Sequence, residues 1–386
     1  MMFFRKTILL LLTFCAVSFT GMAQKANGVT EKTKHASGLL QNNGFFTHLD
    51  VGATLGTTGL GIDVATNLGE YVQMRAGFSY MPRFEMTSSF RVQVGDSLDN
   101  KYDKQGNRVQ TKFDKLSGVL KSMVGYDIDD EIDMTCKPSY YNFKLLFDVF
   151  PFPDKRWHVT AGFFLGSSEV GRAYNKTEEM PSLLSVSMWN MLYHKAYYLE
   201  PLYDNIYMPV ALEDKLLQYG KMGFHAGDYT HDGPFIPVDP ESVSPIDRTA
   251  SGDPIYAYDE ENLPIYIPVK ADANGKAIRA YKKGDPYMMV PDETSGMVKA
   301  YIKANRFKPY VGFGYGGAIS KDKLTQLSFD AGVMFWGGRP SMVTHDGTDL
   351  VRDVENVRGK VGRYVDTAKF FKVFPMIEVR ISRRIF

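Results

Sequence analysis

Eight segments of the chain alternate apolar and polar residues with a period of two. In the last of them, Ile377, Val379 and Ile381 fall on one parity, and Glu378 and Arg380 fall on the other. A period of two indicates a β-strand with two chemically different faces. We therefore expect an all-β fold built on these eight segments. They lie at residues 48–56, 60–66, 71–80, 140–150, 157–166, 308–317, 324–335 and 372–386.

Short and long connections alternate between these strands. The second and third strands, the fourth and fifth, and the sixth and seventh are joined by "NLGE", "PFPDK" and "SKDK". Of the other four connections, "GTTG" is tight, and the remaining three are insertions at about residues 87–137, 173–304 and 340–367. Successive turns of a meander occupy opposite ends, so short turns gather at one end and long loops at the other. This layout predicts an eight-stranded antiparallel transmembrane β-barrel with long, partly helical extracellular loops and both termini on the periplasmic side.

The polar face of the strands carries ionisable residues of both signs in nearly equal number. A soluble sandwich in the periplasm could expose such a face to water. A barrel of eight strands instead fills its interior with side chains, and charges buried there have to be paired. We expect lipid on the apolar face and a salt-bridged lumen on the polar face. The predicted lumen residues are Asp50, Asp63, Arg75, Lys144, Asp148, His158, Lys308, Asp330, Lys372, Glu378, Arg380 and Arg384.

Aromatic residues make up 13% of the chain, which suits a protein with aromatic girdles at two membrane interfaces. The net charge of +1 gives no electrostatic reason to expect a nucleic-acid partner. Membrane lipid is the expected surrounding of the strands. The predicted girdle residues are Tyr71, Tyr80, Tyr141, Trp157 and Phe335.

The first residues predict export. "MMFFRK" supplies a basic region, a short apolar run follows, and small residues precede Gln24, so a signal peptide at 1–23 would be cleaved after Ala23. Phe14 before Cys15 disfavours a lipoprotein, and Cys136 then stands alone in the mature chain. We expect a periplasmic linker at 24–45 and an integral outer-membrane barrel at 46–386.

The leader followed by Gln24, the eight strands, "KPYVGFGYGGA" and the final "RRIF" resemble an outer-membrane β-barrel family of Bacteroidota-type bacteria. The size of the barrel is similar to that of OmpA-like proteins. The resemblance implies an outer-membrane location and insertion by the barrel-assembly machinery. It covers the barrel strands and implies no reaction. Phe386 departs from the family pattern, because it shares the parity of the charged residues.

Other motifs invite chemistry that the sequence favours less. The glycines of "GATLGTTGLG" and "GFGYGG" precede strands, whereas a phosphate loop precedes a helix. His48, His158 and Asp148 share the inward face and could form part of a hydrolytic triad, for which a packed lumen network is the simpler interpretation. We expect no cofactor, and a metal site is only a weak alternative. Its candidate ligands are His225, Asp228, His231 and Asp232.

The insertion at 173–304 is too long for an ordinary loop. Apolar spacing predicts helices over 182–203 and 211–222, and another over 113–125. "GDPIYAY", "NLPIYIP" and "GDPYMMV" suggest a weak repeat of short hairpins. The aromatic and methionine side chains of the first helix either pack inside a cap or offer contact area to a partner: Met188, Trp189, Met191, Tyr197, Tyr198 and Tyr203.

These patterns together predict a non-enzymatic outer-membrane protein of the cell envelope. Its long surface loops would bind an extracellular ligand or protein, or protect the envelope. A small pore or transporter is the second hypothesis, although eight strands leave little room inside. A barrel hydrolase or acyltransferase is the third.

Overall fold

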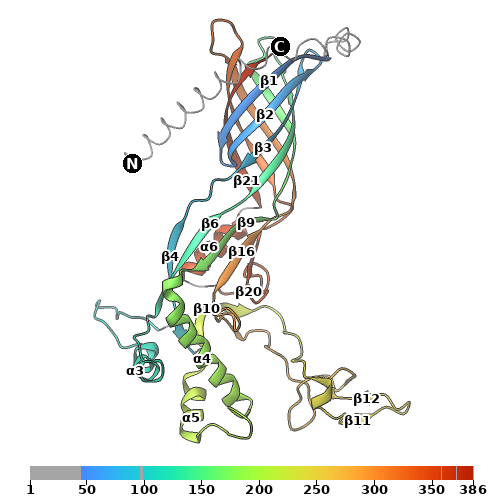
Figure 1. The fold of residues 1–386 in the computed structure, drawn as a ribbon. Coiled ribbons are helices and arrows are strands. Elements are labelled where there is room, and N and C mark those ends of the chain that lie inside the picture. Colours follow the sequence, from blue (N-terminus) through green and yellow to red (C-terminus); the bar gives the residue numbers. More distant parts are fainter. Residues whose placement is uncertain (1–44, 96–98, 358, 371, 386) are drawn as a thin grey trace.

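The computed structural model describes residues 45–95, 99–357, 359–370 and 372–385. The expected leader at 1–23, nearly all of the linker and the terminal Phe386 lie outside these ranges, and the expectations for them remain predictions. Figure 1 shows a barrel at one end of a long molecule and a cap at the other.

Eight antiparallel strands close into a barrel, which confirms the predicted fold class. Their order follows the chain, and the last strand pairs with the first, so that no edge is left open. The strands are β1 (Phe45–Gly56), β2 (Gly59–Leu68), β3 (Val72–Tyr80), β7 (Tyr141–Val149), β8 (Trp157–Gly166), β17 (Phe307–Ala318), β18 (Thr325–Phe335) and β21 (Val373–Arg384).

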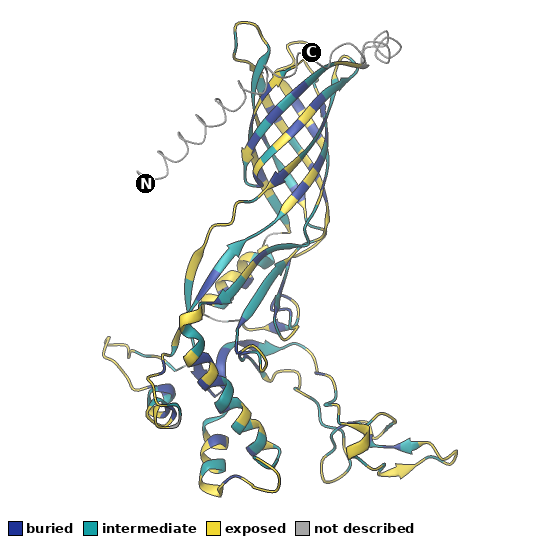
Figure 2. Cartoon of the chain, in the orientation of Figure 1, coloured by how far each residue is buried: buried dark blue, intermediate teal, exposed yellow. Residues whose placement is uncertain are grey.

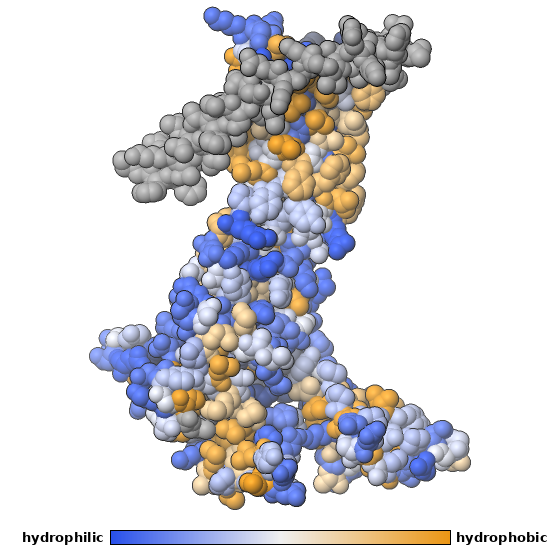
Figure 3. Space-filling view, in the orientation of Figure 1, coloured by the Kyte–Doolittle hydropathy of each residue, from blue (hydrophilic) through white to orange (hydrophobic). Residues whose placement is uncertain are grey.

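Burial alternates along each barrel strand, as Figure 2 shows by its alternating dark and yellow positions. On β7, Asn142 and Lys144 are fully buried, whereas Tyr141 and Phe143 are 53% and 44% exposed. The outward residues are therefore the large apolar ones. As a result, the barrel presents a hydrophobic outer surface between more hydrophilic ends (Figure 3).

Three short connections, at 69–71, 150–156 and 319–324, gather at one end of the barrel, which we call the turn end. The other end, the loop end, carries the three insertions and the tight β1–β2 turn. Gly59 in that turn has a φ of +94°, and a Cβ atom there would lie 2.2 Å from the carbonyl oxygen of Tyr80. Only glycine fits this position.

The barrel strands end a few residues before each expected insertion and resume a few residues after it, so the insertions are slightly longer than expected, and the chain continues from the strands into a second antiparallel sheet. We call the three insertions, at 81–140, 167–306 and 336–372, the cap, and this sheet the stalk sheet. Its order is β19–β16–β9–β6–β4. The strands are β4 (Met86–Arg91), β6 (Glu131–Pro138), β9 (Glu169–Asn175), β16 (Lys299–Lys303) and β19 (Ser341–Thr344).

The cap contains the expected helices and one more. α3 begins at a capping box, in which the Thr111 side chain accepts from the backbone N–H of Asp114 and the Asp114 carboxylate accepts from the backbone N–H of Thr111. The fourth helix, α6, escaped prediction because its few apolar residues and two glycines give little helical signal. The helices are α3 (Lys112–Val124), α4 (Met180–Tyr197), α5 (Val210–Tyr219) and α6 (Gly359–Phe370), with 3-10 turns η3 (Thr177–Glu179) and η4 (Pro240–Ser242).

Short strands complete the cap. The first two segments of the expected repeat form parts of two small hairpins, whereas β15 of the third segment pairs with β10. The hairpin repeat is therefore limited to the first two segments. The strands are β5 (Gln93–Val94), β10 (Met222–Tyr229), β11 (Asp247–Arg248), β12 (Pro254–Ile255), β13 (Ala257–Tyr258), β14 (Pro264–Ile265), β15 (Pro286–Met289) and β20 (Val354–Glu355).

The cap has its own hydrophobic core between the helices and the inner strands. Trp189 of α4 is 2% exposed in it, and its Nε1 donates to the carbonyl oxygen of Gly220 at 2.9 Å. Leu183, Leu216 and Met222 are fully buried beside it. Across the described ranges, no helix has the length and apolar character needed to cross a membrane.

Candidate functional site

Ten of the predicted lumen residues lie in the barrel interior with buried side chains. Arg384, at the turn end, keeps 37% of its side chain exposed. Lys372 does not belong to the set, and its prediction was wrong. It precedes the first residue of β21, and its side chain is exposed. The prediction failed because the alternating pattern was extended past the end of the strand.

Arg75 on β3 lies at the centre of the interior and joins two carboxylates. Its Nε lies 2.6 Å from Asp148 Oδ2, and its Nη2 donates to Asp148 Oδ1 at 2.7 Å and to Asp330 Oδ1 at 2.9 Å. Thr160 donates a further hydrogen bond to Asp148. These contacts link strands β3, β7, β8 and β18 across the barrel.

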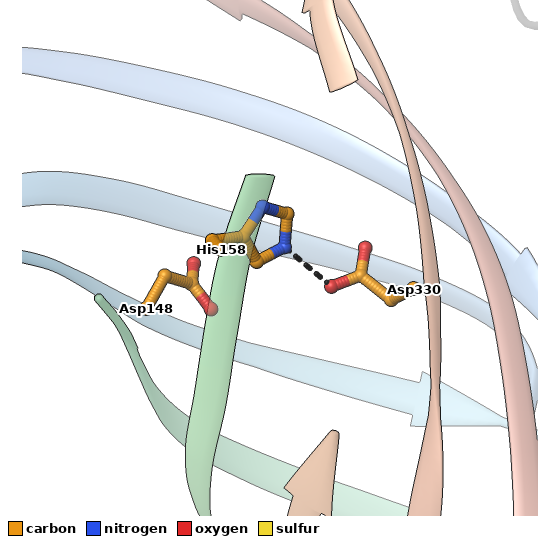
Figure 4. A group of neighbouring side chains, drawn as sticks. All are labelled: Asp148, His158 and Asp330. Atoms are coloured by element: carbon orange, nitrogen blue, oxygen red, sulfur yellow. Dashed lines mark hydrogen bonds and ion pairs between the residues drawn. The ribbon is translucent and has the colours of Figure 1, made fainter. Parts of the chain in front are cut away.

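His158 joins the same group, which Figure 4 shows between the two aspartates. Its Nε2 lies 2.9 Å from Asp330 Oδ1, and its ring packs on Phe150 at 5.3 Å. A Cβ on Gly314 would lie 2.2 Å from this Nε2, so the sequence needs a glycine opposite the histidine.

Asp148, His158 and Asp330 place one ligand atom each within 4.8 Å of one another, a spacing that a metal ion could use. The guanidinium of Arg75 already lies between the two carboxylates and neutralises them. A cation would have to displace it from a fully buried position. The donor set therefore fits an arginine-centred ion network better than a metal site.

The same contacts argue against a hydrolytic triad. A triad needs a nucleophile within hydrogen-bond reach of the base. In the described part of the chain, no hydrogen bond joins His158 to a serine hydroxyl, and the nearby Thr160 donates to Asp148 instead. His48 lies apart, 3.5 Å from Asp50.

A second buried group lies closer to the loop end. Asp63 is placed between Lys144, at 3.2 Å, and Arg380, whose Nε donates to it at 2.8 Å. Lys144 also donates to Glu378 at 2.8 Å. A Cβ on Gly52 would lie 2.7 Å from Asp63 and 2.8 Å from Arg380, which shows how closely the strand backbone approaches this group.

The two remaining buried charges, Asp50 and Lys308, lie towards the two ends of the interior. At the turn end, Asp50 is 3.5 Å from Arg384 and accepts from Gln73. Towards the loop end, Lys308 donates to Asn142 and to the carbonyl oxygen of Ser167, both at 3.2 Å.

An apolar cluster inside the barrel escaped prediction. Its members occupy the same alternating positions as the charged residues of their strands. This parity could have identified them as inward-facing from the sequence. Phe164 and Tyr310 meet edge to face at 5.6 Å. Together with the ion network, the cluster fills the lumen with side chains. It consists of Leu146, Phe164, Tyr310, Met334 and Met376.

All five expected girdle aromatics point outwards and are 41–53% exposed. Tyr71 and Trp157 lie at the turn end, and Tyr80, Tyr141 and Phe335 lie at the loop end. Trp157 packs on Tyr315 at 4.8 Å. Two aromatic levels thus bound the hydrophobic surface of the barrel.

The weak metal candidate in the cap is not assembled. Asp228 accepts from Asn356, Asp232 accepts from the backbone of Lys283, and His231 contacts Thr230. His225 lies on β10 opposite Met288. Among the described residues, these four side chains do not converge on one point.

The cap ends in an exposed apolar surface, visible as orange patches at the far end in Figure 3. Of the expected contact residues, Trp189 is buried and Met188 and Tyr198 are half-buried, while Met191, Tyr197 and Tyr203 are exposed. The segment between α4 and α5 adds more. We call this surface the tip: Met191, Tyr197, Leu199, Tyr203, Ile206, Tyr207 and Val210.

Comparisons with known proteins add little. No protein-family model and no curated protein matches the chain. Similar solved structures include CarO and CarO2 of Acinetobacter baumannii, with 11% and 12% identity over 87% of this chain and 97% and 98% of theirs, at TM-scores of 0.33 and 0.30. A major outer membrane protein from Thermus thermophilus is 10% identical over 87% of this chain and 98% of its own, at a TM-score of 0.24. Scores this low carry no argument, so the fold assignment rests on the closed barrel itself.

Proposed function

We propose that the chain is a non-enzymatic integral outer-membrane protein whose barrel anchors the cap at the cell surface. One observation carries the proposal: the barrel is apolar outside and ion-paired inside. An apolar exterior on a closed sheet is stable in lipid, where every backbone group is satisfied within the barrel. In water the same surface would favour aggregation.

The orientation follows from the two ends of the barrel. Outer-membrane barrels have short periplasmic turns and long extracellular loops. The turn end would therefore face the periplasm, and the cap would face outwards. The expected signal peptide, insertion by the barrel-assembly machinery and the Bacteroidota-type family belong to the same proposal.

The filled lumen supports a role as an anchor over a role as a pore. Arg75 bonds to Asp330 and Lys144 bonds to Glu378, each on a non-adjacent strand, and the apolar cluster packs in the same interior. An ion entering this space would have to break buried ion pairs. A reaction is equally unsupported, because His158 is held by Asp330 and packs against Phe150 with the two rings tilted.

The function would then belong to the cap, whose size and core mark it as a folded unit and not as loose loops. The tip exposes Tyr203 and Tyr207 by 72% and 62%, and Val210 by 71%. Aromatic and aliphatic side chains of this kind supply contact area in protein recognition. We propose that the tip binds an extracellular ligand or protein.

The first test uses detergent-purified protein that shows a heat-dependent gel shift, which reports a folded barrel. In a planar bilayer we expect no stable conducting steps. Regular steps from folded protein would overturn the anchor proposal and favour a transporter. Recovery of folded protein without detergent would contradict the membrane location itself.

The second test addresses the tip in intact cells. Cells would carry either the wild type or the triple variant Tyr203→Ser, Ile206→Ser, Tyr207→Ser. Attachment to a protein-coated surface reports binding, and leakage of a periplasmic enzyme reports envelope integrity. We expect loss of attachment without leakage. Leakage alone would assign the cap to envelope protection.

A further inference from the structure

The stalk sheet has one face that the cap core does not cover. Met134, Ala173 and Ile302 on its inner face pack in the core of the cap. The residues at the alternate positions of these strands face outwards. There, Lys137, Arg172 and Tyr301 form one cross-strand row over β6, β9 and β16, and Tyr174 and Lys299 stand side by side in the next row.

A cleft of about 390 Å³ opens on this outward face. Its volume lies within the range of small-molecule sites. Basic and tyrosine side chains dominate its lining, and all of them can donate hydrogen bonds. The side chains that matter here are Arg83, Lys137, Arg172, Tyr174, Lys299 and Tyr301.

Acidic residues neutralise only part of this charge. Lys137 lies 2.6 Å from Glu85, and Arg172 lies 3.0 Å from Glu169. Among the described residues, no ion pair joins Arg83, Lys299 or the neighbouring Lys303 to an acid. Five basic and two acidic side chains leave an excess of three positive charges. Because Glu85 and Arg172 are well exposed, their ion pairs are weak and can rearrange around a ligand.

The cleft lies directly beyond the loop end of the barrel. Lys137 is four residues before Tyr141, whose ring belongs to the aromatic level there. At about 3.3 Å per residue, this places the cleft roughly 13 Å from that level along the strands. Figure 3 shows the hydrophobic barrel surface changing to hydrophilic surface in this zone. Strands of outer-membrane barrels tilt by about 35–45°, so the cleft stands about 9–11 Å above that level. Lipid headgroups extend about 5–8 Å beyond the hydrocarbon, and flexible lysine and arginine side chains can span the remaining distance.

We propose that the cleft binds the phosphate group of a lipid headgroup in the leaflet that surrounds the loop end. Arginine offers two parallel donors to phosphate oxygens, lysine offers a mobile charge, and the tyrosine hydroxyls add neutral donors. Basic pockets at this depth recognise anionic headgroups. The proposal rests on the proposed membrane location and adds a specific ligand class to it. Bound lipid would hold the stalk sheet, and with it the cap, at a set height above the membrane.

The test measures lipid binding by folded protein in nanodiscs of a neutral lipid doped with a lipid phosphate of the same acyl chains. The variant is Arg83→Gln with Lys299→Gln, which removes two positive charges and leaves both acidic residues paired. The matched control is Arg156→Gln with Lys321→Gln, two exposed basic residues at the turn end. Inorganic phosphate alone is titrated in parallel, and a heat-dependent gel shift confirms the barrel in every sample.

We expect enrichment of the phosphate lipid by the wild type and the control, and binding weakened about tenfold or more in the cleft variant. Equal retention of the neutral and the phosphate lipid, or an unchanged affinity in the cleft variant, would overturn the proposal. Tight binding of inorganic phosphate without lipid enrichment would overturn the assignment of the ligand to a lipid headgroup. A sample without the gel shift, or soluble without detergent, would contradict the membrane location instead of the cleft.

Discussion

The barrel and the cap bury opposite kinds of residue. Inside the barrel, Arg75, Lys144 and Lys308 rank among the largest fully buried side chains of the molecule. Inside the cap, Trp189 and Leu183 take that place. The same chain thus builds one part whose interior is largely charged and whose surface is apolar, and another whose interior is apolar.

Burial alone therefore does not make a hydrophobic core. The cap is organised by water, which drives apolar side chains inwards. In the proposed membrane location the barrel surface would have no such driving force, because hydrocarbon solvates apolar side chains. Its interior is held by charge pairing and hydrogen bonds. Substitutions should therefore act differently in the barrel and in the cap.

Reversal of a lumen charge should have the largest effect. Arg380→Glu leaves Asp63 without one of its two cations and adds a negative charge beside it. We expect a loss of at least about 3–5 kcal/mol in the free energy of unfolding of the barrel. The control is Lys282→Glu in the cap, where Lys282 is 65% exposed and the change should stay within about 0.5 kcal/mol. Urea midpoints in lipid measure both, and equal midpoints would contradict a charge-paired interior.

Truncation of the largest cap-core side chain should act on the cap. Trp189→Ala removes a fully packed ring and its hydrogen bond to Gly220. Substitutions of this size cost about 3–5 kcal/mol. We expect faster proteolysis of the cap, while a protected barrel fragment keeps its heat-dependent gel shift. A simultaneous loss of the barrel would mean that the two parts fold as one unit.

Two valines with similar exposure, one on the barrel and one on the cap, test whether each surface faces lipid or water. Val64 on the barrel is 45% exposed, and Val119 on α3 of the cap is 39% exposed. Val64→Arg should cost about 2–4 kcal/mol if that position lies near the middle of a bilayer. Val119→Arg should change stability by less than about 0.5 kcal/mol. Similar effects on folding yield in lipid would refute a lipid-facing barrel surface.

Acid should lower the stability of the cap through protonation of Asp346. We expect this effect to be smaller than those of the substitutions above. Burial acts to raise the pKa of this carboxyl, but hydrogen bonds from Thr344, Thr348 and Tyr287 outweigh it and hold the pKa below its ordinary value. The ionised form therefore favours folding. Its contribution is complete above about pH 4 and is lost as the pH falls through the folded-state pKa.

Near-ultraviolet circular dichroism between pH 7 and pH 2 measures this dependence. Asp346→Asn should lower the thermal stability of the cap at pH 7 and flatten its decline in acid. A parallel decline in the wild type and the variant would assign the acid sensitivity to other groups.

The eight barrel strands, their short turns and three of the cap helices are evident from the amino-acid pattern. Alternation and helical spacing are local properties, since apolar residues recur every two residues in a strand and about every 3.6 residues in a helix. The parity of Asp63 and Arg380 likewise placed both on the inward face. Extrapolating that parity past a strand end produced the error at Lys372.

Contacts between residues far apart in the chain are evident only in the folded molecule. Asp63 and Arg380 are 317 positions apart, and Arg75 and Asp330 are 255 apart, so no local pattern contains their pairing. The burial of Trp189 depends on α5 and β10 packing against α4. The basic cleft arises because β6 from the first insertion and β9 and β16 from the second align their outward faces. Barrel closure and cross-strand register supply these contacts, and both are properties of the whole chain.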